Sequence, residues 1–381
     1  MTDKIHQFLR RTSWFTDRLT LVKFRNGLSA GLAYLLKRKH SSPFPLALKI
    51  DISPVCNLKC PVCVHAAPDG DDLLEKQDFA VHRMSVDQFR SIVDQVRGKV
   101  SALSLYYLGD PYAHPKVDEM CGIARDANLN VHLSTNFSFR FTDDRIRRIV
   151  ESGVSHLTVC VDGFSQETYS RTRINGRLDF VLSNLERVCK LRRDLNRRFP
   201  RVEVQYIKFP HNAHELDAAL AYFRNIGVDQ VEHTWGMVNN YADLEPRNYA
   251  IQGQREAAGL PLCHWPYDSM VIKYNGDVIP CCNFRHATQY VEGEDARTFG
   301  NVFSSGVQAI WNSETYVTTR RLVADPKLFA GDQGLASHFC HGCPALFHTS
   351  QEKNIQMAPE FDVSRRRVIP ILDHSQLAKV K

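Results

Sequence analysis

Short apolar runs and longer segments with one apolar face alternate through the first two thirds of the sequence. Short segments near residues 46–52, 103–108, 130–134, 156–161, 202–207 and 230–234, either apolar or alternating apolar and polar, predict six β-strands. A segment that starts at Ser85, and segments 116–127, 143–151, 180–193 and 215–224, have the spacing of amphipathic helices. This alternation predicts an α/β fold in which parallel strands close partly into a (β/α)6 barrel.

Breaks in the pattern divide the chain into five segments. Residues 1–42 are predicted to be a helical N-terminal extension, followed by the barrel at 43–238. The polar stretch 239–262 is predicted to be a linker. Residues 263–350 have shorter elements and more turn residues and cysteines, which predicts a small cysteine-rich α+β domain, and 351–381 form a C-terminal tail.

The N-terminal extension mixes apolar and basic residues between Phe15 and His40. A helix packed on the main domain is the first interpretation, and a helix at a membrane surface is the alternative. No apolar run approaches the ~20 residues that span a bilayer. Charged residues interrupt the start of the chain, where a secretion signal would need an apolar core. We therefore expect a cytoplasmic protein with no transmembrane segment.

Composition changes this picture mainly through cysteine. The chain of 381 residues is 43% hydrophobic with a net charge of +6, which is ordinary for a globular protein. The basic cluster between Lys190 and Arg201 is interpreted as a solvated helix face, so we expect no nucleic-acid partner. There are eleven cysteines. In a reducing cytosol, clustered cysteines bind metals or do redox chemistry rather than form disulfides.

The first cysteine group, Cys56, Cys60 and Cys63, directly follows the first predicted strand with the spacing C-x3-C-x2-C. The carboxyl ends of parallel strands are where such folds place their chemistry. Three thiolates hold three corners of a [4Fe–4S] cluster and leave the fourth iron open for another ligand. Zinc, with His65 as a fourth ligand, is the alternative.

This spacing resembles the radical S-adenosylmethionine (SAM) superfamily, and the resemblance continues along the sheet. Leu108-Gly109-Asp110-Pro111 is similar to the family's Gly-Gly-Glu-Pro motif, and Ser134-Thr135-Asn136 to its Thr-Asn-Gly step. Val161-Asp162-Gly163 is similar to the Ser-Ile-Asp-Gly step, with Cys160 in place of the serine, and Arg173 matches an arginine that faces the SAM carboxylate. The resemblance implies a cluster on Cys56, Cys60 and Cys63, and SAM held by Gly109, Asp110, Pro111, Ser134, Asn136, Asp162 and Arg173.

The second cysteine group joins two distant segments. Cys263 and Cys281 flank the turn signal Asn275-Gly276, which predicts a hairpin that brings the two cysteines together. Cys340 and Cys343 supply a second pair. Four thiolates fit zinc or a second [4Fe–4S] cluster equally by chemistry. The pattern resembles the SPASM/twitch extension of radical SAM enzymes, which implies one auxiliary [4Fe–4S] cluster on Cys263, Cys281, Cys340 and Cys343 and leaves Cys282 over.

The resemblance implies an enzyme that cleaves SAM reductively, with an electron from a flavodoxin or ferredoxin, and abstracts a hydrogen atom from its substrate. We predict first an oxidoreductase, a dehydrogenase or epimerase of a small polar substrate such as a sugar or aminocyclitol. The ~45 residues before the barrel are few for a peptide-recognition domain, which favours this substrate. A maturase of a ribosomally made peptide and a non-catalytic zinc-binding protein are the alternatives.

Overall fold

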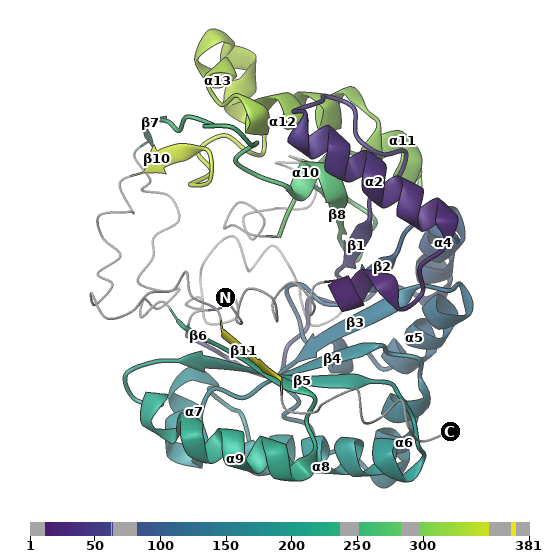
Figure 1. The fold of residues 1–381 in the computed structure, drawn as a ribbon, viewed down its shortest axis with the longest axis vertical. Helices are drawn as coiled ribbons and strands as arrows, with labels where there is room; N and C mark the ends of the chain where they lie inside the picture. The colour runs from purple at the N-terminus through teal and green to yellow at the C-terminus, as the bar shows by residue number, and fades with distance from the viewer. Residues whose placement is uncertain are drawn as a thin grey trace.

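The computed structural model describes residues 12–61, 63, 82–236, 251–282, 298–349 and 367–370 (Figure 1). Its central sheet contains six parallel strands that pair in chain order. They are β1 (Ala47–Ile50), β2 (Ala102–Ser104), β3 (Asn130–Thr135), β4 (His156–Cys160), β5 (Arg201–Lys208) and β6 (Gln230–Trp235). The predicted α/β fold with a partial barrel of parallel strands is confirmed, as is the cysteine-rich C-terminal region.

Helices lie between the strands in sequence and cover the outer face of the curved sheet (Figure 1). They are α4 (Val86–Val96), α5 (Val117–Asp126), α6 (Asp143–Glu151), α7 (Gln166–Thr172), α8 (Leu178–Asp194) and α9 (Leu216–Ile226), with short 3-10 turns at Pro111–Ala113 and Ala213–Glu215. Ser85 caps α4 in a reciprocal capping box with Gln88. The buried side chains of α4 are the predicted apolar face, which ends at Val96. Helix α7 was not predicted, because its residues are mostly polar.

The second strand is shorter than predicted, and the reason lies in the site. We expected a strand over 103–108, but β2 ends at Ser104. Beyond it, the Asp110 N–H donates to the Val55 carbonyl at 2.8 Å, which draws the segment away from the sheet and onto the loop after β1. Residues 106–110 therefore line a cavity instead of extending the ladder.

The C-terminal region continues the same sheet. Strand β8 (Ser269–Ile272) pairs parallel to β1, and β9 (Val278–Ile279) returns antiparallel through the predicted hairpin turn, with Gly276 in the left-handed region at φ +90°. At the opposite edge, β11 (Arg367–Pro370), which falls in the predicted tail, pairs antiparallel to β6. The full sheet runs β11-β6-β5-β4-β3-β2-β1-β8-β9.

The other C-terminal elements pack beside this sheet. They are α10 (Trp265–Asp268), α11 (Val307–Trp311), α12 (Glu314–Ala324), α13 (Leu328–Gly331) and a 3-10 turn at Gln333–Ser337. Strands β7 (Ile251–Gln254) and β10 (Phe347–Thr349) form a separate antiparallel pair. Strand β7 falls in the stretch predicted to be a linker, and 237–250 lie outside the described residues. The five domain boundaries remain predictions.

The N-terminal extension packs on both the barrel and the C-terminal region. The Trp14 ring lies 4.3 Å from the ring of His132, inside the barrel on the face of β3 that also carries Ser134. After it, α2 (Leu21–Leu35) packs on the outside against α10, which confirms the first interpretation of this segment as a helix on the main domain. Among the helices in the described ranges, none is long and apolar enough to cross a membrane.

Candidate functional site

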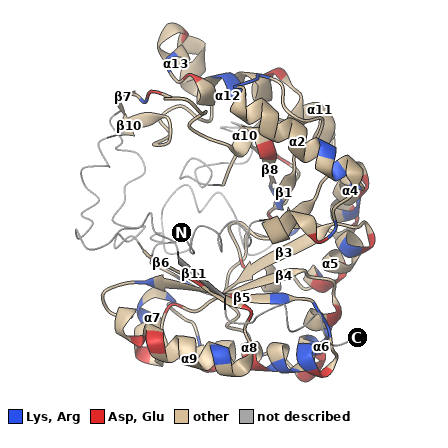
Figure 2. Cartoon of the chain, in the orientation of Figure 1, with Lys and Arg blue, Asp and Glu red and all other residues tan. Residues whose placement is uncertain are grey.

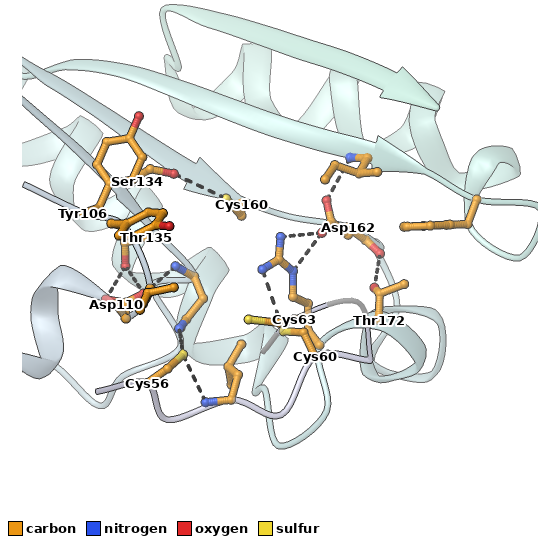
Figure 3. A pocket seen from close by; sticks show the side chains of 18 residues that line it. Cys56, Cys60, Cys63, Tyr106, Asp110, Ser134, Thr135, Cys160, Asp162 and Thr172 are labelled. Atoms are coloured by element: carbon orange, nitrogen blue, oxygen red, sulfur yellow. Dashed lines mark hydrogen bonds and ion pairs between the residues drawn. The ribbon is translucent and has the colours of Figure 1, made fainter. Parts of the chain in front are cut away.

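A cavity of about 220 Å³ opens at the carboxyl ends of the parallel strands. Figure 3 shows the first cysteine group and the strand-end residues Asp110 and Asp162 around it. Its lining contains most of the residues singled out in the sequence: Cys56, Cys60, Cys63, Gly109, Asp110, Ser134, Asn136, Asp162 and Arg173. Pro111 is the exception, because it is buried in the 3-10 turn behind the cavity. The lining also includes residues that were not predicted: Tyr106, Tyr107, Ile207 and Phe209.

The three cysteines of the first group are free thiols on one side of this cavity. Three nitrogen donors approach them: the Leu58 N–H lies 3.5 Å and Asn136 Nδ2 3.8 Å from Cys56 Sγ, and Arg173 Nη1 lies 4.0 Å from Cys60 Sγ (Figure 3). Burial raises the pKa of Cys56 to about 12 and also raises the pKa of Cys60. Buried soft thiols with donors aimed at the sulfurs suit an iron–sulfur cluster, because iron replaces the thiol protons and the donors stabilise the thiolates.

Asp110 holds the wall of the cavity together. Its carboxylate accepts hydrogen bonds from the Thr135 hydroxyl and from the backbone N–H groups of Tyr112 and Asn136, at 2.7–3.0 Å. These bonds fasten the end of β2 to the end of β3. Burial raises the pKa of Asp110 to about 6 despite them. The Asp110 carboxylate is thus fully hydrogen-bonded within the protein. The groups of this motif that can bind a ligand are therefore backbone groups.

Gly109 explains why the motif needs glycine at this position. A Cβ there would lie 2.3 Å from the carbonyl oxygens of Ser53 and Val55. The backbone after β2 therefore passes directly against the backbone that leads into the cysteine loop, and no larger residue fits between them.

Asp162 and Arg173 form a buried pair on the other side of the cavity. Arg173 donates through Nε at 2.8 Å and Nη2 at 2.5 Å to Asp162 Oδ2, while the Ile207 N–H donates to Oδ1. Asp162 lies just after β4, and Arg173 directly follows α7. The ion pair therefore links the end of β4 to the end of α7. The guanidinium, held flat between Asp162 and Cys60, presents a fixed cation to the cavity.

The barrel interior next to the cavity has walls of opposite charge. Glu203 and Glu232 are buried on β5 and β6, on the strand face that also carries Gln205. On the far side, Lys273 pairs with Asp51 at 3.3 Å, and Lys49 Nζ lies 3.9 Å above the ring of Tyr106. The structure thus turns Glu203 and Glu232 toward the barrel interior.

The second cysteine group also comes together. Burial and the nearby Cys281, Cys343 and Cys263 raise the pKa of Cys340. Cys282 instead lies beside the Lys49 ammonium. Across the described ranges, no three His, Cys, Asp or Glu side chains converge on one point at single-ion distance. In a [4Fe–4S] cluster each thiolate binds its own iron, so such convergence is not required.

Comparison with known proteins gives two family matches. Residues 50–223 match the radical SAM superfamily, and residues 263–344 match the SPASM iron–sulfur cluster-binding domain. Together these regions include both cysteine groups. The two matches therefore assign the cofactors of the chain, which are SAM and [4Fe–4S] clusters.

Relatives over the whole length are remote. The chain is 23% identical over 310 residues to the tungsten-containing aldehyde ferredoxin oxidoreductase cofactor-modifying protein of Pyrococcus furiosus, covering 72% of this chain and 82% of that protein. It is 21% identical over 310 residues to the PqqA peptide cyclase of Bradyrhizobium diazoefficiens, covering 71% and 74%.

A solved structure has the same fold. Streptococcus suis SuiB bound to its precursor peptide SuiA superposes with a TM-score of 0.55 at 13% identity, over 78% of this chain and 71% of that one. With the site geometry and the family matches, this likeness leads to one assignment. The chain is a radical SAM enzyme with a C-terminal SPASM domain.

Proposed function

We propose that this enzyme modifies a peptide by radical SAM chemistry, with one cluster on Cys56, Cys60 and Cys63 and an auxiliary cluster on the second cysteine group. The observation that carries the proposal is the cavity in which the three thiols, the Asp162–Arg173 pair and a polar barrel interior meet. SAM bound at such a cluster supplies a deoxyadenosyl radical that abstracts hydrogen from carbon.

The chain's own residues have distinct tasks in this proposal. Arg173 binds the SAM carboxylate as a fixed cation, and the backbone at Gly109 binds the amino group. Ser134, Asn136 and Asp162 line the remaining cavity and position the ligand. Buried walls around the cavity keep solvent and stray hydrogen-atom donors, such as thiols and exposed C–H groups, away from a reactive radical.

Two supports favour a peptide over the small polar substrate that the sequence predicted first. Curated relatives that span most of this chain are named as peptide cyclases, and others as cofactor-modifying proteins. The barrel interior carries both anionic and cationic side chains, Glu203 and Glu232 opposite Lys49, and a peptide can present groups of both signs.

The test is an anaerobic assay of the reconstituted full-length enzyme with SAM, a reductant and short peptides encoded beside its gene. We expect 5′-deoxyadenosine to form faster with the true substrate. We also expect the peptide to lose two hydrogens if it is crosslinked. If it is epimerised, its mass should stay unchanged in H2O and rise by one deuterium in D2O. Turnover with a sugar or aminocyclitol but with no peptide would contradict the proposal.

Matched cysteine variants separate the chemistry from folding. Cys60→Ala is expected to abolish SAM cleavage, because a cluster ligand is lost. Cys189→Ala removes a thiol that is equally buried but lies on α8, outside the cavity, and is expected to leave cleavage intact. Equal loss in both variants would indicate a folding defect rather than a cluster site.

A further inference from the structure

We infer that helix α2 is a docking surface for an anionic membrane, independent of the reaction proposed above. Besides Val22, five large apolar side chains of α2 are exposed and share one face: Leu21, Phe24, Leu28, Leu32 and Leu35, each 44–63% exposed. Their spacing of three or four residues places them in one stripe along the helix. A globular protein rarely exposes so many large apolar side chains on one helix without a partner.

Polar contacts on the inner face fix this orientation. The Lys23 ammonium is buried and donates to the carbonyl oxygens of Arg18 and Asn128. Asn26 Nδ2 donates to the Phe44 carbonyl at 2.9 Å, and the Tyr34 hydroxyl donates to the Pro261 carbonyl at 3.1 Å. Turning the apolar stripe inward would break all of these bonds and bury groups without partners, so the structure holds the stripe outward.

The charge around the stripe indicates the partner. The sequence contains no Asp or Glu between Asp17 and Asp51, and Figure 2 shows blue but no red along α2. Arg25 and the run Lys37-Arg38-Lys39 are exposed, and no ion pair joins them to any acidic group in the described ranges. Lys37 shares a shallow surface pocket with Glu256 and Asp325, but no acidic residue lies on α2 itself. An apolar stripe bordered by basic residues suits a lipid surface with anionic headgroups.

The same stripe could instead join two copies of this chain. That arrangement would bring the basic runs of both copies together with no carboxylate between them, at an electrostatic cost. An anionic membrane meets the apolar stripe and the positive charge together. In Figure 1, α2 lies on the outer side of the molecule beside α4 and α12, where a flat surface can reach it.

The test is sedimentation of the full-length holoenzyme with phosphatidylcholine vesicles, and with vesicles of equal parts phosphatidylcholine and phosphatidylglycerol. We expect binding to the anionic vesicles, weakened by salt and by Lys37→Glu. Leu28→Glu should lower the partition coefficient about tenfold or more, since a buried leucine contributes a factor of that order. Leu195→Glu, at an exposed leucine directly after α8 on the other side of the molecule, is the matched control and should bind normally.

Tryptophan fluorescence provides a second measurement of membrane binding. Phe24→Trp places a reporter in the stripe, and its emission should shift to the blue when anionic vesicles are added. Three results would overturn the inference: no binding of the unmodified enzyme, full binding by Leu28→Glu, or a dimer in solution that Leu28→Glu converts to a monomer.

Discussion

At the scale of single residues, the arginine of the site has two connected tasks. Arg173 neutralises Asp162, whose side chain is only 3% exposed, and its other nitrogen lies near Cys60. A structural task and a ligand-binding task are therefore combined in one guanidinium. The stability of a variant at this position must therefore be measured before its activity is interpreted.

We predict that Arg173→Ala lowers the free energy of unfolding by about 3 kcal/mol, because it leaves a buried carboxylate without its cation. Arg173→Lys keeps the charge but loses the two-nitrogen contact, and should cost about 1 kcal/mol. Urea unfolding under anaerobic conditions measures both. Equal losses in the two variants would mean that the charge of Arg173 does not stabilise the fold.

His114 provides a pH-dependent contribution to stability. Burial lowers its pKa, and its ring bonds the Met84 carbonyl at 2.9 Å through Nε2 and accepts the Lys116 N–H at Nδ1. The unfolded chain takes up a proton near pH 6.5, whereas the folded chain resists it. This contribution is therefore complete above about pH 6.5 and is lost as the pH falls below it.

We predict that the urea midpoint of the wild type falls more steeply below pH 6.5 than that of His114→Gln, which has no group to titrate there. The variant will be less stable at neutral pH, so the slopes and not the absolute values are compared. Parallel pH profiles would show that His114 titrates normally in the folded state.

Most site residues were predictable at this scale, but their tasks were not. The cysteine spacing and the strand-end motifs were readable because each lies within a few consecutive residues. The role of Asp110 as an acceptor for Thr135 and Asn136 depends on the pairing of β2 with β3, which no local pattern states. Tyr106 and Tyr107 could have been predicted to line the site, because they lie in the last residues of the predicted strand 103–108. Such sheets bind ligands at that end of their strands.

At the scale of elements, the contact between the two motif loops is a backbone contact. The loop after β1 carries the cysteines, the loop after β2 carries Gly109, and Asp110 N–H binds the first loop through the Val55 carbonyl. Loss of this contact would displace the cysteine loop without changing any cysteine.

We predict that Gly109→Ala lowers the free energy of unfolding by about 3 kcal/mol and reduces the iron bound after reconstitution, because the new methyl group overlaps two carbonyl oxygens. Gly122→Ala on α5 is the control. Its Cβ would lie 3.6 Å from the nearest backbone oxygen, and the change should stabilise the helix by roughly 0.5–1 kcal/mol. Normal iron content in Gly109→Ala would contradict the proposed role of this contact.

The elements themselves were predicted unevenly. The six strands of the barrel were found because each is a short segment of apolar residues, either continuous or alternating with polar ones, between helical segments. The outward apolar face of α2 could not be predicted, because its sequence alone does not say which face packs against the barrel. The inward rotation is decided by Lys23 and Asn26, whose acceptors are distant in sequence.

At the scale of the whole molecule, the two family-matched regions share one sheet and one core. Strand β8 lies beside β1, and Trp311, fully buried on α11, donates from Nε1 to the Ser42 carbonyl at 2.8 Å. Sequence analysis divided the chain at 262, since composition changes there, but composition does not reveal a pairing across more than two hundred residues.

We predict a single calorimetric unfolding transition for the cluster-loaded enzyme. Trp311→Phe removes the bond to Ser42 and leaves that carbonyl unpaired, at a cost of about 1–2 kcal/mol. It should therefore lower the temperature of the whole transition. Two transitions, of which Trp311→Phe moves only one, would show that the SPASM region unfolds independently.

The position of β1 between β2 and β8 also fixes an order of events during synthesis. The cysteine loop emerges from the ribosome early, but the strand that completes one side of its supporting sheet lies more than two hundred residues later. Until β8 arrives, β1 has an open edge, which is a site for wrong pairing. We therefore expect that the machinery that delivers iron and sulfide acts on the finished polypeptide, and that premature termination before β8 leaves nascent chains dependent on chaperones.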